Sequence, residues 1–211
     1  MEFVTAPDGV KLAVYEFGNP HGPELILIHG FAQAHLCFRP QFTSELLRDF
    51  RIVAYDHRGH GASDKPTDPK AYQSDSVWAD DLTAIMDAKK LRRPVLSGWS
   101  MGGRVIRRYL MHAGDARLAG VNFVGALAIE DPACRGPHGP KSPPIGQSLG
   151  EQIDDAIAFL DGCFAIKPGE ADFRVALAYN ILVPAEVRRA ILGFPADPAL
   201  AIAKLKDRKS T

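Results

Sequence analysis

The chain has 211 residues, of which 46% are hydrophobic and 24% charged, and its 25 basic residues balance its 25 acidic ones. This size and composition suit one substantial globular domain, and the neutral balance gives no net field that would attract nucleic acid or anionic lipid. No apolar run approaches the roughly 18 residues of a membrane span, so neither nucleic acid nor a membrane is expected as a partner.

The ends and the cysteines indicate the compartment. The N-terminus has no basic segment followed by an apolar one, so we expect no secretion signal. The three cysteines show neither metal-ligand spacing nor a disulfide framework; they are Cys37, Cys134 and Cys163. We therefore predict a cytoplasmic protein without a metal or cofactor.

The first half of the chain predicts strands that alternate with helices. A turn at Pro7-Asp8-Gly9, between two β-prone stretches, predicts an N-terminal hairpin. Helical spacing of apolar residues predicts one helix within 75–90 and another that begins near Ser100. Continuous apolar runs predict strands buried on both faces, at 25–28, 51–55, 94–97 and 121–129. Together they predict a doubly wound α/β sheet, which binds ligands at the C-terminal ends of its strands.

The pattern changes after about residue 132. The Pro- and Gly-rich stretch CRGPHGPKSPP indicates a loop or crossover. Three helical segments follow, with helical spacing of apolar residues over 153–164 and 173–181 and a third segment at 184–193. No strand is predicted after residue 130.

The stretch SGWSMGG at 97–103 contains the spacing Gly98-x-Ser100-x-Gly102. It follows an apolar strand and opens an amphipathic helix, which is the geometry of a nucleophile elbow. The helix N-terminus beneath the serine favours developing negative charge. By itself the spacing occurs by chance in roughly one chain in ten of this length, so a tight turn with an incidental serine is the alternative.

Two other motifs follow predicted strands: HGF at 29–31 and DHRGHGAS at 56–63. With GWSMG at 98–102 they resemble the α/β-hydrolase superfamily, in particular the branch of small esterases, cofactor-free haloperoxidases and carbon–carbon bond hydrolases. The resemblance implies a mostly parallel sheet of the α/β-hydrolase type in a core at 1–131. It also implies a helical cap at 132–195 and a connector at 196–211.

The same resemblance implies roles for individual residues. Ser100 matches the nucleophile, and the backbone N–H groups of Phe31 and Met101 match the two oxyanion-hole donors. Two such donors can point at one tetrahedral oxyanion. The Trp99 side chain, like that of Phe31, is a candidate for lining the substrate pocket, with a place in the core as the alternative.

The DHRGHGAS loop looks catalytic, but the resemblance implies that it braces the region near the site. Asp56 and Arg58 are expected to satisfy backbone groups across the loop. His57 and His60 are interpreted as structural residues.

A hydrolase of this type needs an acid and then a histidine downstream of the serine. Only His112, three turns into the helix, and His138, in the Pro/Gly-rich loop, lie downstream, and neither is expected to act as the base. Asp131, which with Glu130 follows the last predicted strand, is the candidate acid. We therefore expect a C-terminally truncated family member, with last strands and helix missing and an open sheet edge that could form a homodimer.

These observations predict a serine hydrolase that cleaves a small ester or related acyl substrate through an acyl-enzyme on Ser100. A neutral hydroxyl needs a base, so the catalytic competence of this chain is in question. Perhydrolysis or halogenation would use the same residues and stays open. The alternative is a non-catalytic ligand-binding or interaction module on a hydrolase scaffold.

Overall fold

The computed structural model describes residues 1–74, 76–126 and 145–193 of the chain. Within these ranges the centre is a six-stranded sheet in the order β1-β2-β4-β3-β5-β6. The first two strands are antiparallel to their neighbours, and β4, β3, β5 and β6 run parallel. The strands are β1 (Glu2–Thr5), β2 (Lys11–Gly18), β3 (Glu24–Ile28), β4 (Arg51–Tyr55), β5 (Val95–Trp99) and β6 (Gly120–Val124). The predicted fold class and hairpin are confirmed.

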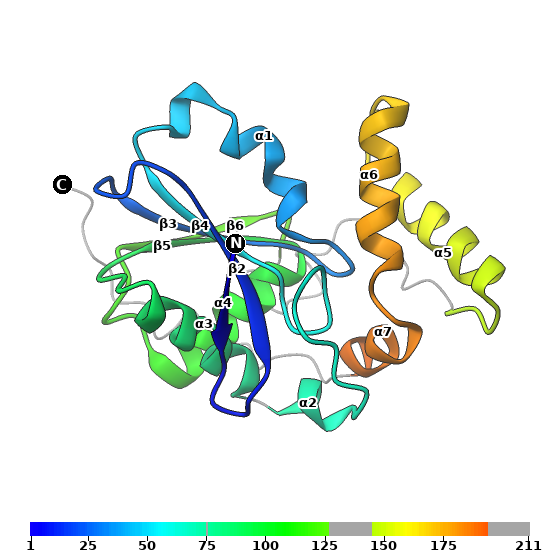
Figure 1. Cartoon of the computed structure of the whole chain (residues 1–211), viewed down its shortest axis with the longest axis horizontal. Helices are drawn as coiled ribbons and strands as arrows, with labels where there is room; N and C mark the ends of the chain where they lie inside the picture. Colours follow the sequence, from blue (N-terminus) through cyan, green and yellow to red (C-terminus); the bar gives the residue numbers. More distant parts are fainter. Residues whose placement is uncertain (75, 127–144, 194–211) are drawn as a thin grey trace, which may run out of the picture.

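Helices cover both faces of the sheet and one of its ends (Figure 1). They are α1 (Arg39–Phe42), α2 (Lys70–Gln73), α3 (Val77–Ala88), α4 (Met101–Ala113), α5 (Leu149–Asp161), α6 (Glu170–Ile181) and α7 (Ala185–Leu192), with 3₁₀ turns η1 (His35–Phe38) and η2 (Glu45–Leu47). All five predicted helices are present. The short helices α1 and α2 were not predicted, because four residues are too few to display a helical period.

Side chains alternate across the sheet and supply a core on each face. On β3, Ile26 and Ile28 belong to the larger core, which includes the buried faces of α3 and α4. Leu27 belongs to the opposite core, beside Phe38 and Phe42 around α1. Figure 1 shows the same division, with α3 and α4 on one side of the sheet and α1 on the other.

The helices α5, α6 and α7 lie beyond one end of the sheet (Figure 1). Leu160 of α5 and Tyr179 of α6 form a small core with Ala34, which follows β3. Helix α5 begins with a capping box in which Ser148 and Glu151 bond to each other's backbone N–H groups. Val187 and Ile191 of α7 join the larger core. The cap-like segment is therefore packed against the larger core and the loop after β3 by its own apolar side chains.

The predicted end of the last strand is wrong. Strand β6 ends at Val124, because Gly125 has φ 52°, a left-handed conformation that ends an extended strand; residues 127–129 of the predicted strand lie outside the described residues. In the described ranges β6 pairs with β5 alone. The expected dimer through this edge stays a prediction. The predicted boundary at 131/132 and connector at 196–211 lie outside the described residues.

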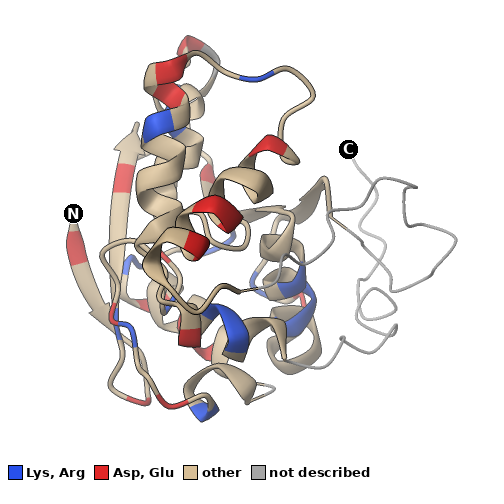
Figure 2. Ribbon diagram, turned by 90° about the vertical axis from the view of Figure 1, so that its right-hand side faces the viewer, with Lys and Arg blue, Asp and Glu red and all other residues tan. Residues whose placement is uncertain are grey.

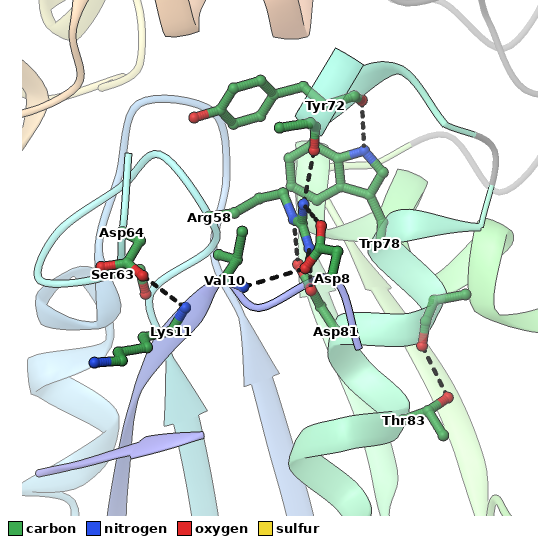
Figure 3. A network of polar contacts seen from close by, with 12 residues as sticks. Asp8, Val10, Lys11, Arg58, Ser63, Asp64, Tyr72, Trp78, Asp81 and Thr83 are labelled. Atoms are coloured by element: carbon green, nitrogen blue, oxygen red, sulfur yellow. Dashed lines mark hydrogen bonds and ion pairs between the residues drawn. The ribbon is translucent and has the colours of Figure 1, made fainter. Parts of the chain in front are cut away.

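A buried arginine ties the loop after β4 to three other segments (Figure 3). The Arg58 side chain is fully buried, and its guanidinium forms ion pairs of 2.6 Å with Asp81 of α3 and 2.7 Å with Asp8 of the hairpin turn. It also donates to the carbonyl of Ala71 in α2. Burial alone would lower the pKa of Arg58, but the two carboxylates outweigh it and raise that pKa.

None of the described helices is long and apolar enough to cross a bilayer.

Candidate active site

Ser100 occupies a sharp turn between β5 and α4. Its backbone has φ 52° and ψ −115°, and the serine is exposed to solvent. A Cβ at Gly98 would lie 2.6 Å from the carbonyl carbon of Gly102, and a Cβ at Gly102 would lie 2.2 Å from the carbonyl oxygen of Ile28. Both positions therefore require glycine, as the elbow motif predicted.

This turn stores backbone strain at the serine. A residue with a Cβ at a positive φ of this kind costs roughly 1–3 kcal/mol. We expect Ser100→Gly to raise the free energy of unfolding by about 1 kcal/mol, since glycine relieves the strain but adds entropy to the unfolded chain. Urea unfolding checks this, with Ser97→Gly in β5 as the control that should destabilise. A lower midpoint for Ser100→Gly would show that the serine conformation is not strained.

The loop after β3 lies directly beside this turn. A Cβ at Gly30 would lie 3.2 Å from the Ser100 Cβ. The loop is fixed by bonds from Gln33 N–H to the Gly30 carbonyl and from Ala32 N–H to His60 Nε2. The N–H groups of Phe31 and Met101 donate to no other described residue. The structure thus places two uncommitted backbone donors on the segments that flank Ser100.

Three buried histidines hold the loop, each bonded to backbone groups. His29 Nδ1–H donates to the Gly30 carbonyl at 2.8 Å, and its Nε2 accepts the His57 N–H at 3.0 Å. His60 Nδ1–H donates to the Arg58 carbonyl at 3.0 Å, and its Nε2 accepts the Ala32 N–H. His57 Nε2–H donates to the His29 carbonyl at 2.9 Å. Burial lowers the pKa of His57 to about 3 and of His60 to about 4, and that of His29 well below its ordinary value.

Asp56 also serves the scaffold. Its carboxylate accepts backbone N–H bonds from His35 and Ala62 at 2.8 and 2.9 Å, and pairs with the His35 ring at 2.9 Å. Burial would raise the pKa of Asp56, but these hydrogen bonds and the His35 ring outweigh it and lower that pKa. The Asp56 carboxylate bonds to His35 and to backbone N–H groups, and the three loop histidines bond to backbone groups, as expected for bracing residues.

A cavity of about 260 Å³ opens over Ser100. Phe31 and Met101 line it, whereas Trp99 is not among its described lining residues, and the Trp99 ring lies against Gly125. The sequence interpretation missed Arg104 and Arg107, which follow the serine at helical spacing and share its side of α4. The complete described lining is Phe31, Ser100, Met101, Arg104, Arg107, Gly125, Ala126, Ile191 and Leu192.

The Ser100 hydroxyl has no hydrogen bond to any residue of the described ranges. His112 is exposed on the last turn of α4. The candidate acid Asp131, its neighbour Glu130 and His138 lie outside the described residues. The described part of the site therefore contains the candidate nucleophile Ser100 and two uncommitted N–H donors, but no base in contact with the serine.

Known proteins share this fold. A family model for the α/β hydrolase fold matches residues 23–144. A crystal structure of a Burkholderia cenocepacia protein assigned as an aryl esterase is 37% identical, with a TM-score of 0.89 over 97% of this chain and 76% of that one. The esterase RhEst1 from Rhodococcus sp. is 30% identical, with a TM-score of 0.80 over 94% of this chain and 74% of that one.

Curated relatives have more varied names. The probable oxidoreductase EphD of Mycobacterium tuberculosis is 41% identical over 92 residues, and a non-heme chloroperoxidase of Streptomyces lividans is 32% identical over 127 residues. These matches cover 44% and 60% of this chain but span only 15% and 45% of the relatives' lengths. Sheet order, elbow and matched family model agree, and the chain belongs to the α/β hydrolase fold family.

Proposed function

We propose that the protein is a serine hydrolase that cleaves small carboxylic esters or related acyl compounds through an acyl-enzyme on Ser100. The observation that carries this proposal is the strained serine at the N-terminus of α4, which borders a 260 Å³ cavity beside two uncommitted N–H groups. The resemblance of the whole described fold to two esterases supports the choice of substrate class.

The reaction follows from these positions. Ser100 Oγ attacks the ester carbonyl carbon, and the carbonyl oxygen becomes an oxyanion that accepts hydrogen bonds from the N–H groups of Phe31 and Met101. The helix N-terminus beneath the serine stabilises the same charge. The intermediate expels the alcohol, which takes up a proton, and water then attacks the acyl-enzyme to release the acid and regenerate the hydroxyl. Both steps need a base, which no described residue supplies, and His138 is the one histidine outside the described residues.

Covalent labelling tests this proposal directly. We expect a fluorophosphonate probe to label the full chain and Ser100→Ala to abolish both labelling and the turnover of p-nitrophenyl butyrate, because the variant lacks the nucleophile. Ser74→Ala, at an exposed serine, is the matched control. His138→Gln tests that histidine as the base. Turnover that survives Ser100→Ala unchanged would refute the proposal.

A ligand-binding module without turnover is the second candidate, favoured by the lack of a described base beside Ser100. Added imidazole separates the two ideas, since a small base can assist a serine that lacks its own. Faster ester cleavage by the chain than by Ser100→Ala, at equal imidazole, supports the hydrolase. Probe labelling no faster than that of Ser100→Ala, with and without imidazole, supports the binding module.

A further inference from the structure

A second cavity lies next to the one over Ser100. Its volume is about 40 Å³, and since a water needs roughly 10–15 Å³ by such a measure, it has room for a group of carboxylate size. Phe31 and Leu192 line both cavities, so the two cavities are neighbours that share these side chains. The other described lining residues come from the cap-like helices and their joining segments: Ile145, Leu149, Gln152, Asp155, Ile181, Val183 and Arg188.

Arg188 gives this second cavity its chemical character. The residue is only 6% exposed, and its guanidinium donates to the carbonyls of Val183 at 3.1 Å and Asn180 at 2.5 Å. These bonds satisfy carbonyls at the end of α6, but a guanidinium carries more N–H donors than two carbonyls occupy. No carboxylate among the described residues forms an ion pair with it. Within the described ranges, Arg188 is therefore a buried cation without an ion-pair partner.

Such a charge is costly to bury, and a bound anion would offset the cost. The nearest described carboxylate in the lining, Asp155, is engaged at 2.7 Å by the Gly146 N–H and acts on Arg188 only through space. Figure 2 faces this side of the molecule and shows acidic residues spread over α5 and α6, with basic residues lower down at α7. The Ser100 cavity is lined by Arg104 and Arg107 and by no described acidic side chain. Apart from Asp155, the described linings of the two cavities contain no acidic side chain that would repel an anion.

We infer that the second cavity is an anion subsite in which Arg188 binds a carboxylate at the end of the substrate's acyl chain. This inference rests on the proposed function and specifies its substrate as a half-ester of a dicarboxylic acid. The acyl part is assigned to this subsite because it stays bound to Ser100 after the alcohol leaves. A cavity that shares Phe31 and Leu192 with the one over Ser100 suits the part that stays.

Esters that differ only in charge provide the first test. We expect the p-nitrophenyl half-ester of succinate, glutarate or adipate to exceed its uncharged methyl diester in kcat/KM by about 10- to 100-fold, the effect of one charge-assisted contact. Arg188→Gln should bring this ratio close to one. Arg189→Gln, at the exposed neighbouring arginine, is the matched control and should leave the ratio unchanged. Equal rates for charged and uncharged esters, or a ratio that survives Arg188→Gln, would overturn the inference.

A binding measurement keeps the inference independent of turnover. In the Ser100→Ala background, calorimetry should show monomethyl adipate binding at least tenfold more tightly than dimethyl adipate, and Arg188→Gln should remove the difference. If Arg188→Gln does not fold, Gln152→Glu places a negative charge in the same lining and should reduce the preference. A preserved preference in that variant contradicts the inference. Selective binding without any ester turnover would support the anion subsite and refute the proposed serine chemistry.

Discussion

Lowering the pH from 6.5 to 4 should reduce the free energy of unfolding by about 5 kcal/mol through His57 and His60, which are buried in their neutral forms. Their pKa values in the folded protein, about 3 and 4, lie below the ordinary value of 6.5. The unfolded chain therefore binds more protons than the folded one in this range. Stability is complete above pH 6.5 and falls as the pH approaches the folded values, by about 1.4 kcal/mol per pH unit for each histidine. Burial explains the direction, because it disfavours the charged imidazolium, and a proton on His60 Nε2 would also displace the Ala32 N–H.

The carboxyl group of Asp81 changes the stability in the opposite direction, and its effect must be separated from that of the two histidines. Burial raises the pKa of Asp81 to about 6 despite its bonds to Arg58, so that carboxyl favours folding as the pH falls through this value. We therefore compare urea unfolding of the protein and of His60→Gln from pH 7 to pH 4. The loss of stability should be smaller in the variant, by about 3 kcal/mol at pH 4. His112→Gln, at an exposed histidine, is the control. Parallel curves for the protein and His60→Gln would refute the assignment.

Asp81→Asn should lower the free energy of unfolding by about 3 kcal/mol or more, because it removes the buried carboxylate that pairs with the buried Arg58 guanidinium. Asp81 is 1% exposed and accepts bonds of 2.7 and 2.6 Å from the guanidinium. Asp8→Asn should cost less, because the Asp8 side chain is 42% exposed and water can replace it.

Denaturant unfolding at pH 7 measures both changes. Asp80→Asn, at the adjacent acidic residue of α3, controls for loss of one negative charge near the helix N-terminus. The expected order of midpoints is Asp80→Asn above Asp8→Asn above Asp81→Asn. If Asp81→Asn matched Asp80→Asn, the ion pair would be contributing no more than a surface charge.

Much of the sheet was predictable because strands buried on both faces appear as continuous apolar runs. The strand at 51–55 was predicted with its observed bounds, and those at 25–28 and 94–97 were displaced by one or two residues. The last strand was overextended because apolar residues continue past Gly125, where the backbone turns. A glycine inside an apolar run was the available signal.

The site was only partly predictable. The glycines at 98 and 102 indicate the elbow locally, because both are required by backbone contacts within and beneath the turn. Arg188 offers no such signal, since its place depends on how α7 meets the loop at Phe31, far away in the chain. Helical periodicity shows which face of α7 is apolar, but not which loop that face covers.

The position of Arg58 has a consequence for how the fold assembles. Its three partners lie in the N-terminal turn, in α2 and in α3, at sequence separations of 50, 13 and 23 residues. A guanidinium removed from water before all three have docked would be poorly compensated. Partly assembled forms are thus penalised relative to both the folded and unfolded chain. The arginine makes the docking of these segments cooperative, and it narrows the range of conditions in which a half-formed core could persist.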